Sequence, residues 1–444
     1  MISLIGMLFQ FFFSLCGLKF FVGQDRVIGV RDFGFERLGA MLMGIDPDDP
    51  EVWGGKRARN YKGFLASPAV NPSVVPPIST LGRTELIGTI NLTSLNAPYN
   101  LPTNGGLIPN DRFLAGLVLR LSGRVTNAGT NNPTGTQADG LYALLDTITI
   151  EGQHLLRSNR EQFILARGPD LKEVMGLYMS RFPKTSGTLS TTASAAVDFT
   201  CFLPIWFFPL GIPAAQQAYY LLDAPNYSNL KLTIQWPDDK NIYTGQTTAS
   251  TFSANGSASG NPSIDVYGIF AQAGPSAFKG YVPGRMFLTF QENLSSQLTS
   301  TGTAQSLFNL PTGYHVRSFL IKTGVKSTAT TSGNNSYNTL SDTILSNVKF
   351  QRGFNKNHRI YKTFDMLKED GAMAYALSPD TGYGLMDYAQ HGTVKESMDA
   401  TQLVSGATGD VAFNLVSDVA GASNQGALIL QQELRYDPQL LSAA

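Results

Sequence analysis

Leu144-Leu145-Asp146-Thr147-Ile148 and Leu340-Ser341-Asp342-Thr343-Ile344 are two versions of one segment, 196 positions apart in a chain of 444 residues. Four more pairs of segments match in the same order: Gly82-Arg83 with Gly284-Arg285, Asn100-Leu101-Pro102-Thr103 with Asn309-Leu310-Pro311-Thr312, residues 120–125 with 322–326, and Ala196-Val197-Asp198-Phe199 with Asp410-Val411-Ala412-Phe413. One short match arises by chance. Ordered matches whose spacing changes in loops indicate an internal duplication, with copies of about 160–195 residues.

Each copy is predicted to consist of β-strands, because apolar residues recur at every second position. Leu230, Leu232, Ile234 and Trp236 alternate with polar residues. Further alternating sets are Phe113, Ala115, Leu117, Leu119 and Leu121; Val197, Phe199, Cys201 and Leu203; and Val411, Phe413 and Leu415. Loops rich in Gly, Asn, Thr and Ser follow at residues 126–140, 244–262 and 327–339. This pattern is typical of eight-stranded antiparallel sandwiches.

Short helical insertions are expected in both copies. Ser158-Asn159-Arg160-Glu161 has the form of a capping box and predicts a helix through Phe163-Ile164-Leu165. Pro169, followed by two acidic residues in the next turn, predicts a helix that continues to Leu177. Residues 364–377 form a weaker counterpart in the second copy.

The first 80 residues differ from the rest of the chain. Residues 1–22 carry one charge, Lys19, and we consider three interpretations: a membrane-contacting anchor, an arm held against neighbouring subunits, or a processed leader. An amphipathic helix and a Pro-rich linker are expected to follow. We therefore predict three regions: an arm and linker at 1–80, a first sandwich at 81–275 and a second at 276–444.

Two small charged clusters lie within this arm. Asp46-Pro47-Asp48-Asp49-Pro50 has acidic side chains of the kind that bind calcium, but a solvated Pro-rich turn explains it more simply. Lys56-Arg57-Ala58-Arg59 is basic, but four residues are a thin signal for phosphate binding. Neither cluster predicts a metal or cofactor site.

The charge balance limits the possible partners. Lys and Arg number 33, Asp and Glu number 33, and charged residues make up 15% of the chain, against roughly 25% in soluble proteins. A neutral chain has no electrostatic reason to wrap nucleic acid. A surface so poor in charge suggests that much of it is covered by partners.

The sequence predicts no catalytic, cofactor-binding or metal-binding residue. Gly256-Ser257-Ala258-Ser259-Gly260 fits the GxSxG pattern of hydrolases, but it lies in a loop with no helical pattern behind it. Asp146 and Asp342 occupy equivalent places in the repeat, where an Asp caps backbone amides. Two cysteines, Cys16 and Cys201, make no disulfide framework. The remaining candidates for ligands are the scattered histidines His154, His315, His358 and His391.

Aromatic residues are the remaining candidates for a binding surface. Trp53, Trp206 and Trp236 are of the kind that line sugar grooves, although burial in a core is the commoner role. The segment FLPIWFFPLG at residues 202–211 is dense in large hydrophobic side chains and contains two prolines. We predict that it forms a contact between subunits.

The paired Gly-Arg, Asn-Leu-Pro-Thr and Leu-x-Asp-Thr-Ile segments, with an apolar N-terminal arm, resemble the double-jelly-roll major capsid proteins of tectivirus-like and corticovirus-like bacteriophages and their relatives. The resemblance covers roughly residues 82–440 and implies an all-β fold of two consecutive eight-stranded jelly rolls. It also implies a non-enzymatic subunit of the virion, assembled in the host cytoplasm, whose pseudo-hexagonal homotrimers tile an icosahedral shell. Implied partners are neighbouring capsomers, minor capsid or penton proteins, and an internal membrane reached by residues 1–22. The arm of about 80 residues is longer than is usual for these proteins.

Two other functions are compatible with a β-sandwich. A secreted or surface-anchored carbohydrate-binding protein would use the N-terminus as leader or anchor and the aromatic residues as a glycan platform. A carbohydrate-active enzyme would need two carboxylates about 5–9.5 Å apart in one groove, and the sequence indicates no such pair.

Overall fold

The structure is a computed structural model. It describes residues 81–102, 104–155, 160–207, 221–246, 248–271, 286–298, 304–309, 315–325, 339–352, 357–361, 363–387, 398–399, 413–419 and 425–436. All of these belong to one compact unit, residues 70–443. None of the helices among them is long and apolar enough to cross a membrane.

Two facing antiparallel sheets make up the first half of the described chain. The first runs in the order β1 (Leu81–Asn91), β12 (Ser263–Ala271), β3 (Leu114–Thr126), β8 (Ala196–Trp206) and β7 (Thr185–Ser186), and β11 (Thr251–Ser253) also pairs with β3. The second runs β2 (Ala97–Asn100), β9 (Lys231–Trp236), β5 (Thr147–Gln153) and β6 (Arg160–Ala166). β4 (Gly135–Thr136) pairs with β10 (Tyr243–Thr244). The eight longer strands have the order of a jelly roll.

Alternation along the strands builds the core between these sheets. In β9, Leu232, Ile234 and Trp236 are buried while the residues between them are half-buried, so the predicted period of two is confirmed. The facing strands β3 and β8 show the same alternation. Their buried side chains include Leu117, Leu119, Leu121, Phe199, Cys201, Leu203 and Ile205. Burial of these apolar surfaces is the main contribution to the stability of the sandwich.

The second half repeats this strand order. One sheet contains β13 (Met286–Leu298), β22 (Gln425–Tyr436), β15 (His315–Val325) and β19 (Tyr383–Asp387), with β16 (Thr339–Leu340) and β20 (Met398–Asp399) on β15. The facing sheet runs β14 (Ala304–Asn309), β21 (Phe413–Val419), β17 (Leu345–Arg352) and β18 (Asn357–Tyr361). The predicted duplication into two eight-stranded jelly rolls is therefore confirmed.

The paired segments mark equivalent places in the two halves, with one exception. Asn100 ends β2 and Asn309 ends β14, and the two Asp-Thr-Ile segments lead into β5 and β17. The match of Ala196-Val197-Asp198-Phe199 with residues 410–413 is wrong. Residues 196–199 begin β8, which pairs with β3, whereas Phe413 begins β21, which pairs with β14 and β17 and so corresponds to β9. The true counterpart of β8 is β19, which pairs with β15.

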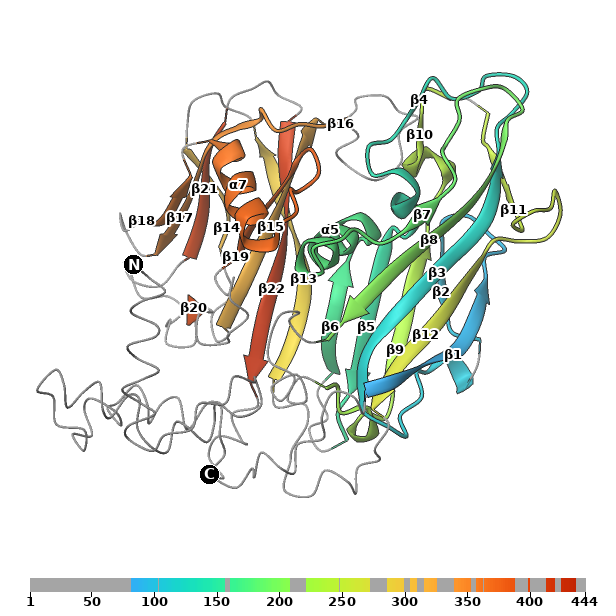
Figure 1. Ribbon diagram of the computed structural model, residues 1–444, viewed down its shortest axis with the longest axis horizontal. Coiled ribbons are helices and arrows are strands. Elements are labelled where there is room, and N and C mark those ends of the chain that lie inside the picture. The colour runs from blue at the N-terminus through green and yellow to red at the C-terminus, as the bar shows by residue number, and fades with distance from the viewer. Residues whose placement is uncertain are drawn as a thin grey trace, which may run out of the picture. The chain divides into compact units, whose positions relative to one another are not determined.

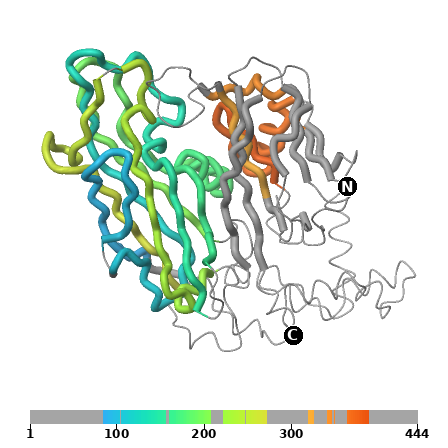
Figure 2. Tube along the Cα trace, turned by 180° about the vertical axis from the view of Figure 1, so that it is seen from behind, coloured from blue at the N-terminus to red at the C-terminus, as the bar shows by residue number. Residues whose placement is uncertain are grey.

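A parallel pairing joins the two jelly rolls into one ten-stranded sheet (Figure 1). β6 of the first half lies beside β13 of the second, with Ile164 opposite Phe290 and Leu165 opposite Gln291. Figure 2 shows β6 and the other strands of the first jelly roll from behind. The relative position of the two jelly rolls is thus fixed by backbone pairing as well as by side chains.

One helix follows the β6-type strand of each half. α5 (Gly168–Tyr178) begins with Pro169 in its first turn, as predicted, and α7 (Phe364–Tyr375) begins after Thr363, whose hydroxyl accepts a hydrogen bond from the Met366 amide. Short 3-10 turns are η4 (Asn104–Gly106), η5 (Gly140–Leu144), η7 (Ala224–Asn226) and η8 (Asp239–Asn241).

The capping-box prediction is wrong. Residues 160–166 form strand β6, and residues 156–159 lie outside the described residues. Phe163 and Ile164 are buried between β5 and β13, so pairing on both sides of this strand outweighs the local helix signal.

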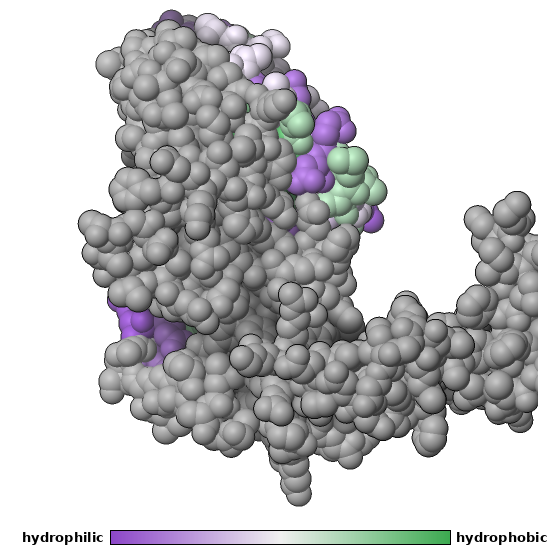
Figure 3. Space-filling model, turned by 90° about the vertical axis from the view of Figure 1, so that its left-hand side faces the viewer, coloured by the Kyte–Doolittle hydropathy of each residue, from purple (hydrophilic) through white to green (hydrophobic). Residues whose placement is uncertain are grey.

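α7 is amphipathic and covers one side of the second jelly roll. Its buried positions recur at helical spacing and face β19: Phe364, Leu367, Gly371 and Tyr375. Met366 and Met373 lie on the opposite face and are 49% and 77% exposed. In Figure 3, hydrophobic and hydrophilic residues lie next to each other on the side of the molecule that carries this helix.

Candidate functional site

A lysine in the middle of a buried strand marks the junction between the two jelly rolls. Lys322 lies in β15, with Tyr383 of β19 opposite it on one side and Leu428 of β22 on the other. All residues from 318 to 324 are buried, so both faces of this strand are covered. Lysine is almost never fully buried unless it is paired.

The partners of Lys322 come from the first jelly roll. Its Nζ forms an ion pair with the Asp139 carboxylate and lies 3.7 Å from Oδ1 of Asp170. The Tyr383 hydroxyl donates a hydrogen bond to Asp139 (2.8 Å), and its oxygen lies 3.3 Å from Oδ1 of Asp170. Asp139 immediately precedes η5, and Asp170 lies in the first turn of α5. Two elements of one half therefore present carboxyl groups to two strands of the other.

Burial and neighbouring charge shift the pKa values of this group. Burial raises the pKa of Asp170, and the positive charge of Lys322 only partly offsets this. For Lys322, burial opposes the charged form, but Asp139 and Asp170 outweigh it and the pKa is raised. Burial and the same carboxylates raise the pKa of Tyr383 well above 10, so its hydroxyl remains a donor.

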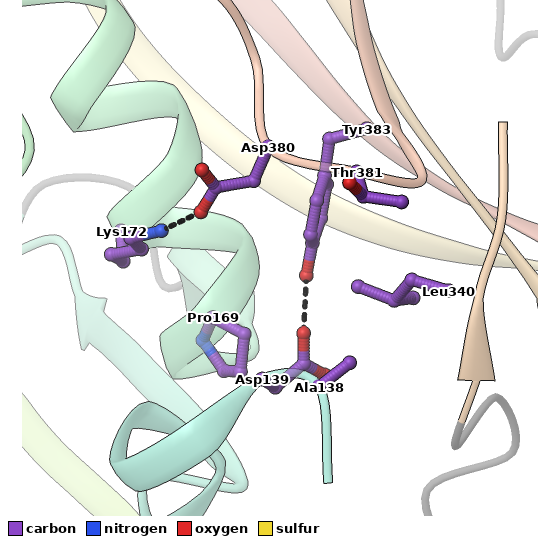
Figure 4. Close-up of a pocket in the computed structure, with 8 residues that line it drawn as sticks. All are labelled: Ala138, Asp139, Pro169, Lys172, Leu340, Asp380, Thr381 and Tyr383. Atoms are coloured by element: carbon purple, nitrogen blue, oxygen red, sulfur yellow. Dashed lines mark hydrogen bonds and ion pairs between the residues drawn. The ribbon is translucent and has the colours of Figure 1, made fainter. Parts of the chain in front are cut away.

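A second ion pair lies at the solvent-facing side of the junction. Lys172 of α5 pairs with Asp380, which is 49% exposed, and its Nζ lies 4.1 Å from the centre of the Phe182 ring. This pair and Asp139 border a cavity of about 290 Å³ (Figure 4). The residues lining it are Ala138, Asp139, Pro169, Lys172, Leu340, Asp380, Thr381 and Tyr383.

Glu173 connects α5 to the same loop of the second jelly roll. Its carboxylate accepts a hydrogen bond from the backbone amide of Asp380 (2.8 Å) and lies 3.4 Å from Nζ of Lys172. The side chain is fully buried. Burial raises the pKa of Glu173 to about 7, against a lowering by Lys172. This contact therefore changes its charge near neutral pH.

Aromatic residues of the two helices complete the junction. Tyr178 of α5 and Tyr375 of α7 have ring centres 5.3 Å apart, with planes inclined at 57°. The hydroxyls of Tyr178 and Ser318 are 3.0 Å apart, and the Tyr375 hydroxyl donates to Asp387. Both tyrosine hydroxyls are thus satisfied, that of Tyr178 across the two halves and that of Tyr375 within the second half.

These contacts fix the two jelly rolls relative to each other. The groups in the junction pair with one another, with the cavity opening beside the Lys172–Asp380 pair. Across the described part of the chain, no cluster of three or more His, Cys, Asp or Glu side chains is arranged to hold a metal ion. The arrangement is that of a buried structural contact whose charges are paired.

The residues that the sequence singled out do not gather in one place. The GxSxG segment, residues 256–260, is a loop that leads into strand β12, as expected. Asp342 accepts a hydrogen bond from the Gly382 amide (2.6 Å) and pairs with Lys368, in line with its expected capping role. Asp146 instead accepts a hydrogen bond from the Asn241 side chain (3.4 Å).

Most of the aromatic and histidine candidates lie in the core or in strands. Trp236 is buried against Phe252, and Trp206 is half-buried at the end of β8. His154 packs edge-on against Tyr227. Leu203 and Ile205 of the FLPIWFFPLG segment point into the core. The candidates outside the described residues are residues 1–22, 46–50, 56–59 and 208–211, with Trp53 and His391.

The junction residues were not predicted from the sequence, although one signal was present. Aligning Gly123 with Gly324 places Lys322 at the position of Leu121, which is fully buried in the first jelly roll. A lysine at a core position of a repeated strand indicates either a buried ion pair or a special contact.

Comparisons with known proteins identify the fold. No family profile and no curated protein matches this sequence. The STIV major capsid protein, seen in its crystal structure, superposes with a TM-score of 0.59 and 14% identity, covering 81% of this chain and 99% of that chain. The chain has the double-jelly-roll fold. A structure from Sulfolobus Turreted Icosahedral Virus superposes with a TM-score of 0.55 and 15% identity, covering 81% of this chain and 95% of that one.

Proposed function

We propose that this double-jelly-roll protein is the major capsid protein of an icosahedral virus, a structural subunit without enzymatic activity. The observation that carries the proposal is that one chain holds two jelly rolls side by side through β6 and β13, with the buried junction around Lys322. The same fold in the STIV major capsid protein supports it. So does the low, balanced charge of the chain, which suits surfaces covered by neighbours.

The strand edges suggest how copies associate. Within the described strands, β1 and β18 are edge strands, and each has one partner. The strand equivalent to β1 in the second jelly roll is β13, and the strand equivalent to β18 in the first is β6. These two strands pair with each other. Between two chains, β18 of one copy can pair with β1 of the next in the same way as β6 pairs with β13 within one chain. This contact joins different surfaces of the two copies, so it is a head-to-tail interface. A ring of three such chains contains six jelly rolls and has a pseudo-hexagonal outline.

The exposed edge supports this arrangement. Leu86 of β1 is 56% exposed, and an uncovered edge strand with exposed apolar side chains is prone to further pairing. We therefore assign residues 81–275 and 276–444 to the two jelly rolls of the ring. Residues 1–80 would contact neighbouring subunits or an internal membrane, and minor capsid or penton proteins would fill other positions. The site of action is the virion shell, with assembly in the host cytoplasm.

Light scattering on the purified full chain, with negative-stain images of the same peak, tests the proposal. We expect a species of about three chain masses that persists on dilution and has a hexagonal outline. Leu86→Lys should shift this species toward the monomer, while Leu155→Lys, at a site that is 59% exposed and outside the strand edges, should not. A wild-type monomer that binds glycans would overturn the proposal in favour of a carbohydrate-binding protein.

A further inference from the structure

We propose that Lys322 and Asp139 become joined by an amide bond between their side chains, an isopeptide cross-link that ties the two jelly rolls together covalently. Asp170 is the acid that assists the reaction. The proposal concerns the chain's own chemistry and does not depend on the proposed function.

The geometry brings the three groups together where their side chains are largely buried. The Lys322 amine contacts the Asp139 carboxylate, and Asp170 lies 3.7 Å from the same amine. The side chains of Lys322, Asp139 and Asp170 are 4%, 10% and 3% exposed. A nucleophile and a carboxyl group held in contact react with a high effective concentration, and burial of the amine and of Asp170 limits the competing hydrolysis.

Asp139 is positioned for this contact and not for an ordinary helical role. It occupies the N-cap position of η5, where an Asp side chain usually accepts a hydrogen bond from a backbone amide. Here the side chain makes no capping bond. It is directed toward Tyr383 and the second jelly roll, as Figure 4 shows. The Tyr383 hydroxyl donates to its Oδ1 and withdraws electron density from the carbonyl carbon that would be attacked.

The reaction balances without any other reactant. A proton moves from the Lys322 ammonium to the Asp139 carboxylate, which leaves a neutral amine and a carboxylic acid. The Nζ lone pair attacks Cγ of Asp139, the new C–N bond forms, and one C–O bond of Asp139 breaks. The oxygen leaves as water, with one hydrogen from the amine and one from the acid. Asp170 donates a proton to the leaving oxygen and regains one from the nitrogen.

Burial favours the product over the ion pair. A buried ion pair carries a large desolvation penalty, whereas an amide is neutral and retains its hydrogen-bonding groups. The raised pKa of Asp170 keeps a proton available for transfer. The raised pKa of Lys322 makes the neutral amine the minor form, so the reaction is a slow event that occurs once after folding.

The Lys172–Asp380 pair provides a matched control within the same junction. It has the same two residue types in contact and an acid, Glu173, beside them. Asp380 is 49% exposed, so water solvates this pair and reverses any condensation. We therefore expect a cross-link at the buried pair and none at the exposed one.

Intact-mass measurement of the denatured full chain tests the proposal. We expect the folded wild-type protein to be lighter than its sequence by one water molecule. Trypsin should release residues 125–157 joined to residues 318–326, with no cleavage after Lys322. Asp139-Gly140 is also a sequence that forms a cyclic imide with loss of water, but an imide leaves the two peptides separate.

Variants assign the roles of the three residues. Lys322→Met and Asp170→Asn should have the full mass, whereas Lys172→Met should still lack one water. Asp139→Asn, if it reacts, should lose ammonia in place of water. A folded wild-type protein at its full mass, or a mass loss that maps to the imide or to Lys172, would overturn the proposal. The intact mass and peptide map of the wild-type protein are sufficient to accept or reject the cross-link. A variant that fails to fold therefore does not affect the outcome.

Discussion

Replacing Glu173 with glutamine should change how the stability of the protein depends on pH. The side chain is fully buried in α5 and holds the Asp380 amide of the second jelly roll. Burial raises its pKa from 4.5 to about 7. The folded protein therefore favours the protonated carboxyl group more strongly than the unfolded chain does, and the glutamine side chain resembles that protonated form.

The size of the change in the free energy of unfolding follows from the shift in the pKa of Glu173. A rise from 4.5 to about 7 corresponds to roughly 3 kcal/mol, at about 1.4 kcal/mol for each pH unit. Because the folded-state pKa is raised, this contribution is fully present below pH 4.5 and is lost as the pH rises through about 7. Glu173→Gln should therefore unfold like wild type at low pH. Above about pH 8 it should be more stable than wild type by roughly 3 kcal/mol.

Guanidinium unfolding at a series of pH values, at one protein concentration, measures this difference. Asp239→Asn is the matched control, because burial and the neighbouring Asp238 raise the pKa of Asp239 to about 7 within the first jelly roll. Both variants should reduce the pH dependence. Only Glu173→Gln should slow amide hydrogen exchange in β19 at high pH, since Glu173 touches the second jelly roll. A Glu173→Gln effect that is equal at every pH would refute the reasoning.

Three further predictions concern stability and reactivity. Leu119→Ala should lower the free energy of unfolding by about 2–5 kcal/mol, because the side chain is fully buried between the sheets, and chemical denaturation measures it. Thr363→Ala should cost about 1 kcal/mol through loss of the cap on the Met366 amide, whereas Thr363→Ser should not. In Cys16→Ser protein, Cys201 should react with a thiol reagent only after unfolding, because burial raises the pKa of its thiol to about 12; rapid labelling of the folded protein would contradict this.

The sequence was sufficient for the fold because the duplicated segments lie where strands begin and end. Asn100 and Asn309 each end a strand, and the Asp-Thr-Ile segments lie at the start of equivalent strands, so an alignment of the two halves carries topological information. The match of residues 196–199 with 410–413 failed because alternating apolar residues are common to all strands. A short alternating match therefore says that a segment is a strand, but not which strand it is.

Local signals also failed where a distant strand decides the structure. Residues 158–161 have a good capping box, yet Ile164 pairs with Phe290, far along the chain. No local pattern contains that partner. Pro169, by contrast, was a reliable signal, because its ring and missing amide proton restrict the backbone regardless of tertiary contacts.

The junction between the two jelly rolls shows why some residues must differ between the two copies of a duplicated segment. Leu121 and Lys322 occupy equivalent strands, but Leu121 faces the core of its own sandwich, whereas Lys322 contacts Asp139 of the other sandwich. An apolar side chain suits a core in any copy, and it would fit an apolar neighbour equally well. A buried lysine requires a carboxyl group at one defined position, so it penalises every other arrangement of the two halves. The differences between repeated segments, more than their similarities, therefore locate the contact that fixes the two jelly rolls together.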